Sequence, residues 1–343
     1  MDTGKGDAGS GSGSGVAREA QVANLCHGRE ETAVSLKGRS YLSVTDLTPQ
    51  EAGDVLRVAA EQKSGKVTRE QMASLARGQN LAILFDKSSL RTRIGFEVAM
   101  SQLGGHAVYL APADVRLGDR EPVADVAKVL GRTVDGIAAR LSKHEFVQEL
   151  AQFSGVPVVN AMSNLEHPCQ ALADLMTMQE HKGELKGRKL AWVGDGNNVC
   201  HSLLLMASMF GMDIHIASPA TYEPKQAILT KASELAKASG AKIAVWNDAQ
   251  QAVTGADIVE TDVWVSAGAE EQAQRRRMDF RAFQLSAALL KEAKPDAIVL
   301  HCLPAHRGEE VTEEVTESSQ WVAFDEAENR LHTQRALLSM LLG

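Results

Sequence analysis

Short, continuously apolar runs alternate with amphipathic helical segments from Asn80 almost to the end of the chain. Such runs are typical of strands that are buried on both faces of a parallel sheet, whereas strands with one wet face alternate apolar and polar residues. Helices between the strands would cover both faces, so the pattern predicts an α/β fold. The expected strands are residues 81–85, 107–111, 136–141, 156–161, 189–194, 213–218, 242–246, 257–261 and 297–302.

The length of the chain and one long helix predict that the alternating strands and helices form two lobes. A chain of 343 residues is too long for one typical core and suits two domains. A long helix that starts at His167 interrupts the alternation, and we expect it to join two doubly wound lobes, each with a central parallel sheet flanked by helices. The predicted domains are residues 35–165 and 166–325, and the last segment, 326–343, is expected to form a helix that packs back on the first domain.

Composition and charge exclude several classes of partner. A net charge of -8 and an aromatic content of 4% disfavour a nucleic-acid surface. No apolar run is long enough to span a bilayer. The four cysteines lack the paired spacing of a disulfide framework, which indicates a reducing compartment. Residues 1–34 begin with a Gly/Ser-rich stretch and predict a flexible tail without a signal peptide. We therefore expect a cytoplasmic protein with no nucleic-acid and no membrane partner.

Five polar clusters follow directly after predicted strands: "DKSSLRTR", "ARLSKH", "GDGNN", "TDVWVS" and "HCLPAHR". Ligands of open α/β sheets bind outside the carboxyl ends of the strands, so these clusters predict a cleft lined by both lobes. The first cluster also opens a helix, where free N–H groups and the helix dipole favour an anion. Hydroxyl donors and the Arg91 guanidinium would add to such a phosphate site. The alternative is an ordinary helix cap with two surface arginines.

Two further motifs place imidazole and thiol groups beside this cleft. In "HPCQ", Pro168 suits the first helical position, and His167 and Gln170 can point the same way to hold a carbonyl and an NH2 group. The alternative is a capped core histidine. In "HCLP", Cys302 could be a nucleophile, a metal ligand or a local proton partner. A zinc site of Cys302, His301 and His306 matches no standard ligand spacing, and a Cys–His hydrolase lacks an orienting partner.

Several motifs occur together in the order and setting of a known family. "SLRTR", "HPCQ", "DVWVSAG" and "HCLPAHRGEE" resemble signatures of the aspartate/ornithine carbamoyltransferase family, and the resemblance runs from about Leu36 to the C-terminus. The last two, with "VGDGNNVCHSLL", resemble its ornithine-specific branch. The resemblance implies transfer of the carbamoyl group of carbamoyl phosphate to the δ-amine of L-ornithine, giving L-citrulline and phosphate. It also implies a homotrimer or a multiple of trimers, with no metal and no organic cofactor.

The resemblance also assigns residues to the two substrates. It implies a phosphate site made of Ser89, Leu90, Arg91, Thr92 and Arg140. It places His167, Gln170 and Arg330 on the carbamoyl group. On the ornithine side it implies Asn198 at the carboxylate, Asp262 and Ser266 at the α-amino group with Ala267 in the same loop, and Cys302 and Leu303 beside the reacting amine. The residues expected to act in catalysis are Arg91, His167, Gln170, Asp262, Cys302 and Arg330.

Two positions depart from the commonest ornithine-type pattern. Leu90 stands where a threonine is frequent, so one hydroxyl is missing from the phosphate loop. Ala267 replaces the usual methionine. If the family's contact there is made by the backbone, the change is mild, whereas a side chain that packs on the methylenes of the substrate would be missed and the KM for ornithine would rise. Other acceptors therefore stay open, namely N-acetylornithine, N-succinylornithine and putrescine. Aspartate is disfavoured because Asp262 would repel a second carboxylate.

Two readings belong to other classes of protein. A catalytically silent homologue that acts as a binding subunit would be expected to have lost some of the catalytic side chains that this chain retains. The hypothesis of a dinucleotide-dependent oxidoreductase rests on the α/β pattern alone, which is weak evidence of function. The segment "GDGNN" also lacks the third glycine of the dinucleotide fingerprint.

Overall fold

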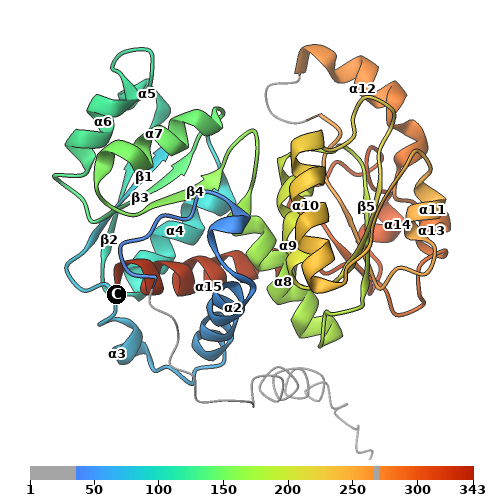
Figure 1. Cartoon of the computed structure of the whole chain (residues 1–343), viewed down its shortest axis with the longest axis horizontal. Coiled ribbons are helices and arrows are strands. Elements are labelled where there is room, and N and C mark those ends of the chain that lie inside the picture. The colour runs from blue at the N-terminus through green and yellow to red at the C-terminus, as the bar shows by residue number, and fades with distance from the viewer. Residues whose placement is uncertain (1–35, 266–269) are drawn as a thin grey trace, which may run out of the picture.

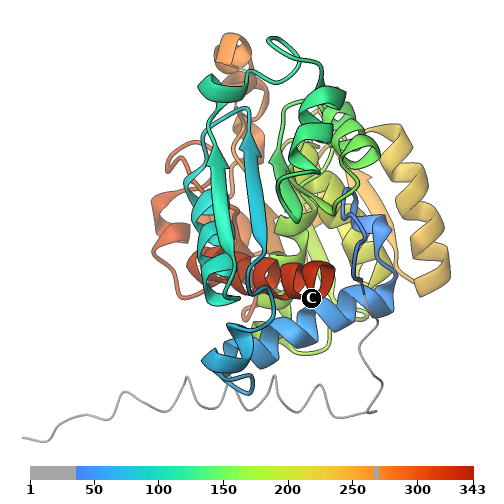
Figure 2. The ribbon, with the colours of Figure 1, turned by 90° about the vertical axis from the view of Figure 1, so that its left-hand side faces the viewer.

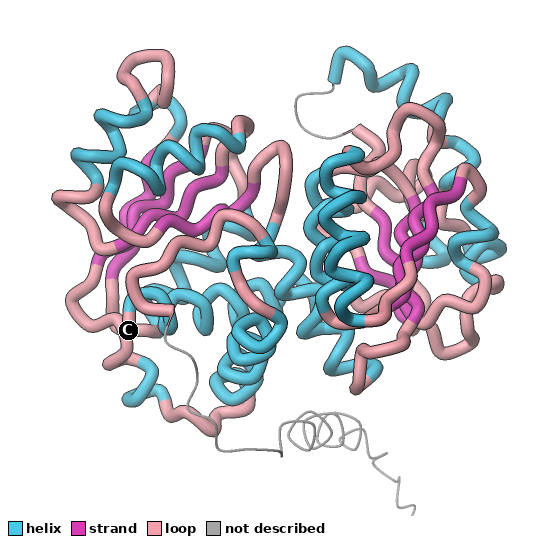
Figure 3. The backbone as a smooth tube through the Cα atoms, in the orientation of Figure 1, coloured by secondary structure: helices cyan, strands magenta, loops and turns pink. Residues whose placement is uncertain are grey.

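Two parallel sheets organise the computed structural model, which describes residues 36–265 and 270–343 (Figures 1 and 3). The predicted α/β fold with two doubly wound lobes is confirmed. The predicted tail, residues 1–34, lies outside the described residues. The strands are β1 (Asn80–Phe85), β2 (His106–Leu110), β3 (Gly136–Arg140), β4 (Val158–Met162), β5 (Lys189–Val193), β6 (Asp213–Ala217), β7 (Ile243–Trp246), β8 (Ile258–Thr261) and β9 (Ile298–Leu300).

The strand order creates one switch point in each sheet. The first sheet has the order β2-β1-β3-β4 and the second the order β7-β6-β5-β8-β9, and all pairs are parallel. The chain moves outward from β1 to β2 and then crosses to β3 on the other side of β1. It does the same from β5, first to β6 and β7 and then to β8. The loops that leave the carboxyl ends of β1 and β3, and of β5 and β8, therefore diverge and leave room for ligands.

Helices cover both faces of the two sheets (Figure 1), and the strands are largely buried except for the edge strands β2 and β7, which stay partly exposed. Many begin at polar caps, and the expected capping box of Thr48 and Glu51 at the start of α2 is present. The helices of the first part are η1 (Val44–Asp46), α2 (Pro49–Lys63), α3 (Arg69–Met72), α4 (Leu90–Gln102), α5 (Pro112–Val115), α6 (Val123–Leu130) and α7 (His144–Ser154). Those of the second part are α8 (Pro168–Lys182), α9 (Asn198–Met209), α10 (Gln226–Ser239), α11 (Ala249–Val253), η2 (Glu270–Gln272), α12 (Ala273–Asp279), η3 (Arg281–Phe283), α13 (Ala287–Leu290), α14 (Glu313–Thr316) and α15 (Ala323–Leu342).

The last helix, α15, returns from the second sheet and lies along α8, α4 and α2 (Figure 2). Gly95 lies where α4 faces α15, and a Cβ there would lie 2.3 Å from Gln334 Oε1, so the end of the buried Gln334 side chain would have to shift. A single helix therefore contacts the segment after β1 and the helix that connects the two sheets. Within the described residues, no helix is long and apolar enough to cross a membrane.

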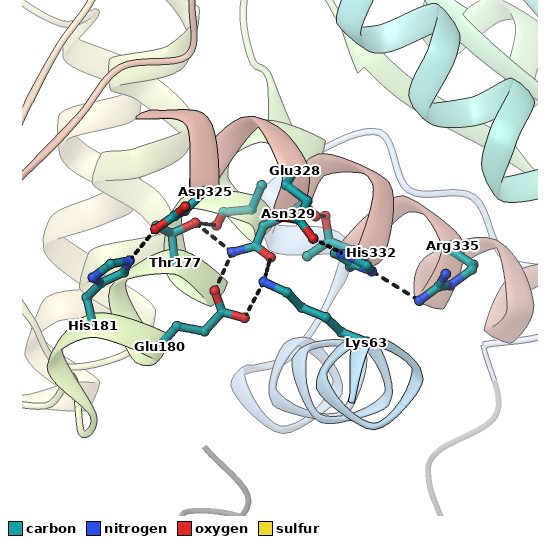
Figure 4. A network of polar contacts seen from close by, with 11 residues as sticks. Lys63, Thr177, Glu180, His181, Asp325, Glu328, Asn329, His332 and Arg335 are labelled. Atoms are coloured by element: carbon teal, nitrogen blue, oxygen red, sulfur yellow. Dashed lines mark hydrogen bonds and ion pairs between the residues drawn. The ribbon is translucent and has the colours of Figure 1, made fainter. Parts of the chain in front are cut away.

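A polar network fixes α15 against α8 and α2 (Figure 4). Lys63 Nζ on α2 donates to Glu180 Oε1 of α8 and to Asn329 Oδ1 of α15, each at 2.8 Å. Asn329 Nδ2 in turn donates to Glu180 Oε2 at 2.8 Å and to Thr177 Oγ1 at 2.9 Å. The ion pair is only partly exposed, so the network holds the register of α15 firmly. That register sets where Arg330, the next residue of α15, can reach.

Candidate functional site

The predicted site residues come together at the switch points of the two sheets. The loop after β1 leads into Ser89, the N-cap of α4, while Arg140 ends β3 beside Phe85, the last residue of β1. In the second sheet, the loop after β5 leads into Asn197, the N-cap of α9, and Asp262 directly follows β8. Parallel pairing alone thus brings together segments that are far apart in the sequence.

Three guanidinium groups converge beside the start of α4, and within the described residues none of them forms an ion pair with a carboxylate. Within the described part of the chain, the hydrogen bonds of Arg91, Arg140 and Arg330 go to neutral oxygens. Thr92 Oγ1 accepts from Arg140 Nη1 and from Arg330 Nη2, each at 3.2 Å. The Nε atoms of Arg140 and Arg330 are buried and have no partner in the described structure. Clustered unpaired cations next to a helix N-terminus form an anion site.

Burial and mutual repulsion act on these arginines. Burial, with smaller contributions from Arg330 and Arg91, lowers the pKa of Arg140 to about 10. Burial is also the main cause that lowers the pKa of Arg330, which is 3% exposed. Both side chains stay charged at neutral pH, so a bound dianion would relieve their repulsion.

The side-chain amide of Gln170 has one fixed orientation. Its Nε2 donates both hydrogens, to Asp174 Oδ1 and to Glu326 Oε1, each at 2.7 Å. Its Oε1 accepts from Arg330 Nη1 at 2.5 Å. With both N–H groups used, the amide can meet a ligand only as an acceptor through Oε1. It therefore suits an NH2 group of a ligand and not a carbonyl oxygen.

His167 lies at the N-cap of α8 and is 3% exposed. Burial lowers its pKa well below the usual value, and the charges of Arg330 and Arg140 add to the effect. The imidazole is therefore neutral at physiological pH and can supply one N–H donor. Its Nδ1 is buried without a partner in the described structure, so the side chain is not the fully satisfied core histidine of the alternative reading.

Asp262 forms the acidic centre of the second lobe. Asn197 Nδ2 donates to its Oδ2 at 2.7 Å, and the backbone N–H of Val263 donates to its Oδ1 at 2.8 Å. The Cys302 thiol donates to Oδ1 at a sulfur–oxygen distance of 3.2 Å. These three donors fix a buried carboxylate, 6% exposed, that suits an ammonium group of a ligand.

The Cys302 thiol is a hydrogen-bond donor and not a thiolate. Burial raises its pKa well above the usual value, and the nearby Asp262 and Glu326 carboxyl groups raise it further. A thiol in such surroundings is a poor nucleophile at neutral pH. His301 is committed elsewhere, because Nδ1 accepts from Leu303 N at 2.8 Å and Nε2 lies 3.3 Å from Glu310 Oε1. The donor set therefore disfavours the zinc site of Cys302, His301 and His306.

Arg91 connects the two lobes directly. Its Nη2 donates to the carbonyl oxygen of Leu303 at 2.5 Å. Leu303 has a φ of +58°, which costs a non-glycine residue of order 1–3 kcal/mol and needs support from its surroundings. The Leu303 carbonyl is thus held beside the arginine cluster, between Cys302 and the start of α4.

The contacts of Leu90 and Asn198 add detail to their predicted roles. The Leu90 side chain is 74% exposed, so only its backbone N–H lies at the helix start. Asn198 Nδ2 donates to the carbonyl oxygen of Ser163 at 2.7 Å, and Asn197, which the motif analysis passed over, is the residue bonded to Asp262. Ser266 and Ala267 lie outside the described residues. Asp174 and Glu326 were also missed, although each lies four residues from a predicted site residue on the same helix face.

The fold and the site define a two-lobed α/β enzyme that holds a phosphorylated group at one switch point and an amine at the other. Comparison with known sequences agrees with this class. Residues 39–180 match the family "Aspartate/ornithine carbamoyltransferase, carbamoyl-P binding domain", and residues 186–341 match its "Asp/Orn binding domain". This chain belongs to the aspartate/ornithine carbamoyltransferase family, and the resemblance stated from the sequence is confirmed.

Individual relatives are similar over almost their whole length. The chain is 49% identical over 313 residues to the ornithine carbamoyltransferase of Carboxydothermus hydrogenoformans, covering 90% of this chain and 99% of the relative. The solved ornithine carbamoyltransferase structure from Pyrococcus furiosus matches with a TM-score of 0.87 and 47% identity, covering 90% and 99% of the two chains. That from Thermus thermophilus matches with a TM-score of 0.79 and 45% identity, covering 88% and 98%.

Proposed function

We propose that this enzyme transfers the carbamoyl group of carbamoyl phosphate to the δ-amine of L-ornithine, giving L-citrulline and phosphate. The observation that carries the proposal is the convergence of Arg91, Arg140 and Arg330 beside the start of α4 without a carboxylate partner in the described structure. Such a site requires a multiply charged anion. The acceptor is inferred from the relatives, which are named ornithine carbamoyltransferase. The sequences of two of them are 49% and 50% identical to this chain, which supports the same reaction here.

Carbamoyl phosphate would bind at the first switch point. Its phosphate would accept from the backbone N–H groups at Ser89, Leu90 and Thr92 and from the side chains of Arg91 and Arg140. Gln170 Oε1 would accept from the carbamoyl NH2 group, because its amide nitrogen is already committed. The carbamoyl oxygen would then face the N–H groups of His167 and Arg330.

Ornithine would bind at the second switch point. Asp262 would hold the α-ammonium group together with Ser266 and Ala267 of the following loop. Asn198, at the first position of α9, would hold the carboxylate with the N–H groups of the helix start. Cys302 and the Leu303 carbonyl would lie beside the δ-amine, and the Leu303 oxygen can accept from an N–H of that amine.

The chemistry follows from these placements. A lysine-like ammonium has an unperturbed pKa near 10.4 and must lose a proton before it attacks, and burial in the closed site favours the neutral amine. Attack on the carbamoyl carbon puts negative charge on its oxygen, which Arg91, His167 and Arg330 stabilise. The C–O bond to phosphate then breaks, and the leaving phosphate takes the proton that the attacking nitrogen sheds. Holding the two substrates in line supplies much of the remaining acceleration.

Replacing Cys302 with serine is expected to leave substantial turnover. A serine hydroxyl can still donate to Asp262, and the protonated thiol is a poor nucleophile, so kcat should fall by no more than about tenfold. The measurement is steady-state citrulline formation, with carbamoyl phosphate and ornithine binding measured separately. Complete loss of turnover with normal binding of both substrates would point instead to a covalent carbamoyl-thiol intermediate.

We further propose the assembly, the location and the domain limits of the chain. The proposed assembly is a homotrimer or a multiple of trimers, and the proposed location is the cytoplasm. The proposed domains are a carbamoyl phosphate domain at residues 35–165, to which the helix within 326–343 returns, and an ornithine domain at residues 166–325. The assembly rests on the family resemblance, the location on the unpaired spacing of the four cysteines, and the domain limits on the long helix that interrupts the alternation of strands and helices. Two relatives, from Pyrococcus furiosus and Campylobacter jejuni, are named anabolic ornithine carbamoyltransferases, which supports a biosynthetic direction.

The acceptor is tested by comparing amines at a fixed concentration of carbamoyl phosphate. The kcat/KM for ornithine is expected to exceed those for N-acetylornithine, N-succinylornithine, putrescine and aspartate by at least about 100-fold. Each of these four amines would leave a buried polar group of the site unpaired or would meet a repelling charge. A preference for another amine would keep the carbamoyl phosphate half of the proposal and replace its acceptor. Absence of turnover with every amine, despite binding of carbamoyl phosphate, would favour the silent homologue.

A further inference from the structure

A cluster of three carboxyl groups lies buried directly behind the reacting centre. Asp174 of α8, Glu260 of β8 and Glu326 of α15 are fully buried, and one carboxyl oxygen of each lies within 4.8 Å of those of the other two. The carbamoyl-transfer chemistry proposed above uses none of them. Buried carboxyl groups are costly unless they are protonated or hydrogen-bonded, so a cluster of three requires an explanation.

Glu326 bridges the two halves of the site. Its Oε1 accepts from Gln170 Nε2, and its Oε2 accepts from the backbone N–H of His301, both at 2.7 Å. Gln170 is proposed to hold the carbamoyl NH2 group, while His301 precedes Cys302 beside the acceptor amine. One carboxylate thus ties the carbamoyl side to the acceptor side.

The same helix clamps Gln170 from both ends. Glu326 and Arg330 are four residues apart on α15 and share one face. Glu326 takes an N–H of the Gln170 amide, and Arg330 donates to its carbonyl oxygen. Asp174, one turn along α8 from Gln170, takes the second N–H. Rotation of the amide by 180° would turn its NH2 group toward the Arg330 guanidinium and its oxygen toward the two carboxyl groups. The three charged partners therefore fix the orientation of the amide.

Hydrogen bonding indicates which members of the cluster carry protons. Both oxygens of Glu326 accept from N–H donors, as in an ionised carboxylate. Asp174 Oδ2 and both oxygens of Glu260 are buried and receive no donor within the described structure. Protons on Asp174 and Glu260 would turn these orphaned acceptors into donors toward neighbouring carboxyl oxygens. Burial raises the pKa of all three carboxyl groups, that of Asp174 to about 7 and those of Glu260 and Glu326 well above the usual value, so the cluster holds protons at neutral pH. The two N–H donors to Glu326, and the lack of donors at Asp174 Oδ2 and Glu260, place the negative charge on Glu326.

We propose that Glu326 is a positioning residue for carbamoyl transfer. Protonated Asp174 and Glu260 keep Glu326 ionised. Glu326 in turn fixes Gln170 with its carbonyl toward the carbamoyl group and connects Gln170 to the His301–Cys302 segment. The inference rests on the proposed function. It extends that function to three residues that touch neither substrate, and it distinguishes their roles: Glu326 must accept twice, whereas Asp174 must accept once and donate once.

The charged and titratable groups that act on the cluster are Asp262 after β8, Cys302 after β9, Cys200 of α9 and Arg330 of α15. Arg330 offsets one negative charge, that of Glu326. Loss of the Asp174 proton would add a second negative charge close to the carbamoyl oxygen, where the reaction itself develops negative charge. The extra charge would therefore oppose catalysis as the pH rises through the pKa of Asp174, about 7.

Three amide variants of the full-length enzyme test the proposal. Glu326→Gln keeps size and shape but turns an amide NH2 toward Gln170 Nε2 or His301 N. We expect kcat to fall by about tenfold or more, the effect of losing a hydrogen bond to a charged group, with little change in the KM for ornithine. Asp174→Asn reproduces the protonated acid, so its kcat at pH 7 should stay within about threefold of wild type. The matched control is Glu328→Gln, an amide variant of an exposed carboxylate on the same helix that pairs with His332 of α15, and it should retain wild-type kcat.

The pH profile separates positioning from a merely structural role. Asparagine at position 174 cannot ionise, so the ratio of its kcat to that of wild type should rise as the pH increases above about 7. Thermal melting will show whether each variant folds. If Glu326→Gln does not fold, the pH dependence of the Asp174→Asn ratio still tests the proposal. A ratio that is flat with pH would overturn the proton assignment, as would equal losses in Asp174→Asn and Glu326→Gln.

Two other outcomes have separate meanings. If Glu326→Gln folds and retains the kcat of Glu328→Gln, the positioning role is wrong. If wild-type activity is lost on treatment with a chelator, a cation and not shared protons holds the cluster together, and the proposal is overturned. Failure of the wild-type enzyme to form citrulline would refute the proposed function itself, and that result is visible before any variant is made.

Discussion

Replacing Arg91 with methionine is expected to lower kcat/KM for carbamoyl phosphate by about 10²- to 10³-fold, the effect of removing one well-placed donor from a developing oxyanion. The guanidinium lies at the start of α4, beside Arg140 and Arg330, and also donates to the Leu303 carbonyl. Methionine preserves much of the length of the side chain and removes all of these donors. Both the phosphate site and the direct contact between the lobes should be lost. The measurement is citrulline formation over a range of carbamoyl phosphate concentrations.

Arg93 provides the matched control for this prediction. It lies on the same helix, two residues further on, but pairs with Glu97 at 2.8 Å and stacks on the ring of Tyr109 at 3.8 Å. Arg93→Met should therefore keep kcat/KM within about threefold of wild type. Arg91→Lys should recover only part of the loss, because an ammonium cannot reproduce the fork of a guanidinium. Equal losses in Arg91→Met and Arg93→Met would mean that the helix start, and not Arg91 itself, is what matters.

The strands and their direction could be predicted because the apolar runs have no polar alternation. Each predicted strand overlaps an observed one, and the expected cap of α2 is present. Once the strands are known to be parallel, the polar clusters after them must gather at the carboxyl edges, so Arg140 and Asp262 could be placed near the cleft. These steps depend only on local periodicity and on sheet geometry.

The partners of individual side chains could not be predicted in this way. Asn197 and Asn198 are equivalent in a motif, and only the N-cap geometry of α9 decides that Asn197 turns back to Asp262. The link between Glu326 and Gln170 depends on the register of α15 against α8, which the Lys63–Glu180 pair helps to fix. Such tertiary contacts have no signal in the spacing of residues along the chain.

Replacing Asp262 with asparagine is expected to lower kcat/KM for ornithine by about 100-fold or more, since an ammonium group loses a buried, hydrogen-bonded counter-charge. Asn197 Nδ2 and Val263 N each donate to one carboxylate oxygen, so an amide NH2 in that place must oppose one of these donors. The binding of carbamoyl phosphate at the other sheet should change little. The measurement is the KM for each substrate, together with kcat, in the variant and in wild type.

Asp257→Asn serves as the control, because Asp257 lies at the opposite end of β8 from Asp262. Its carboxylate pairs with Arg188 at 3.0 Å and Lys294 at 2.8 Å, and neither residue approaches the cleft. That variant should lose stability without a change in the KM for ornithine, since a structural ion pair is weakened while the substrate site is kept. An Asp262→Asn enzyme with a normal KM for ornithine would show that another group holds the α-ammonium. The carbamoyl phosphate half of the site would then stand, and the acceptor half would have to be assigned again.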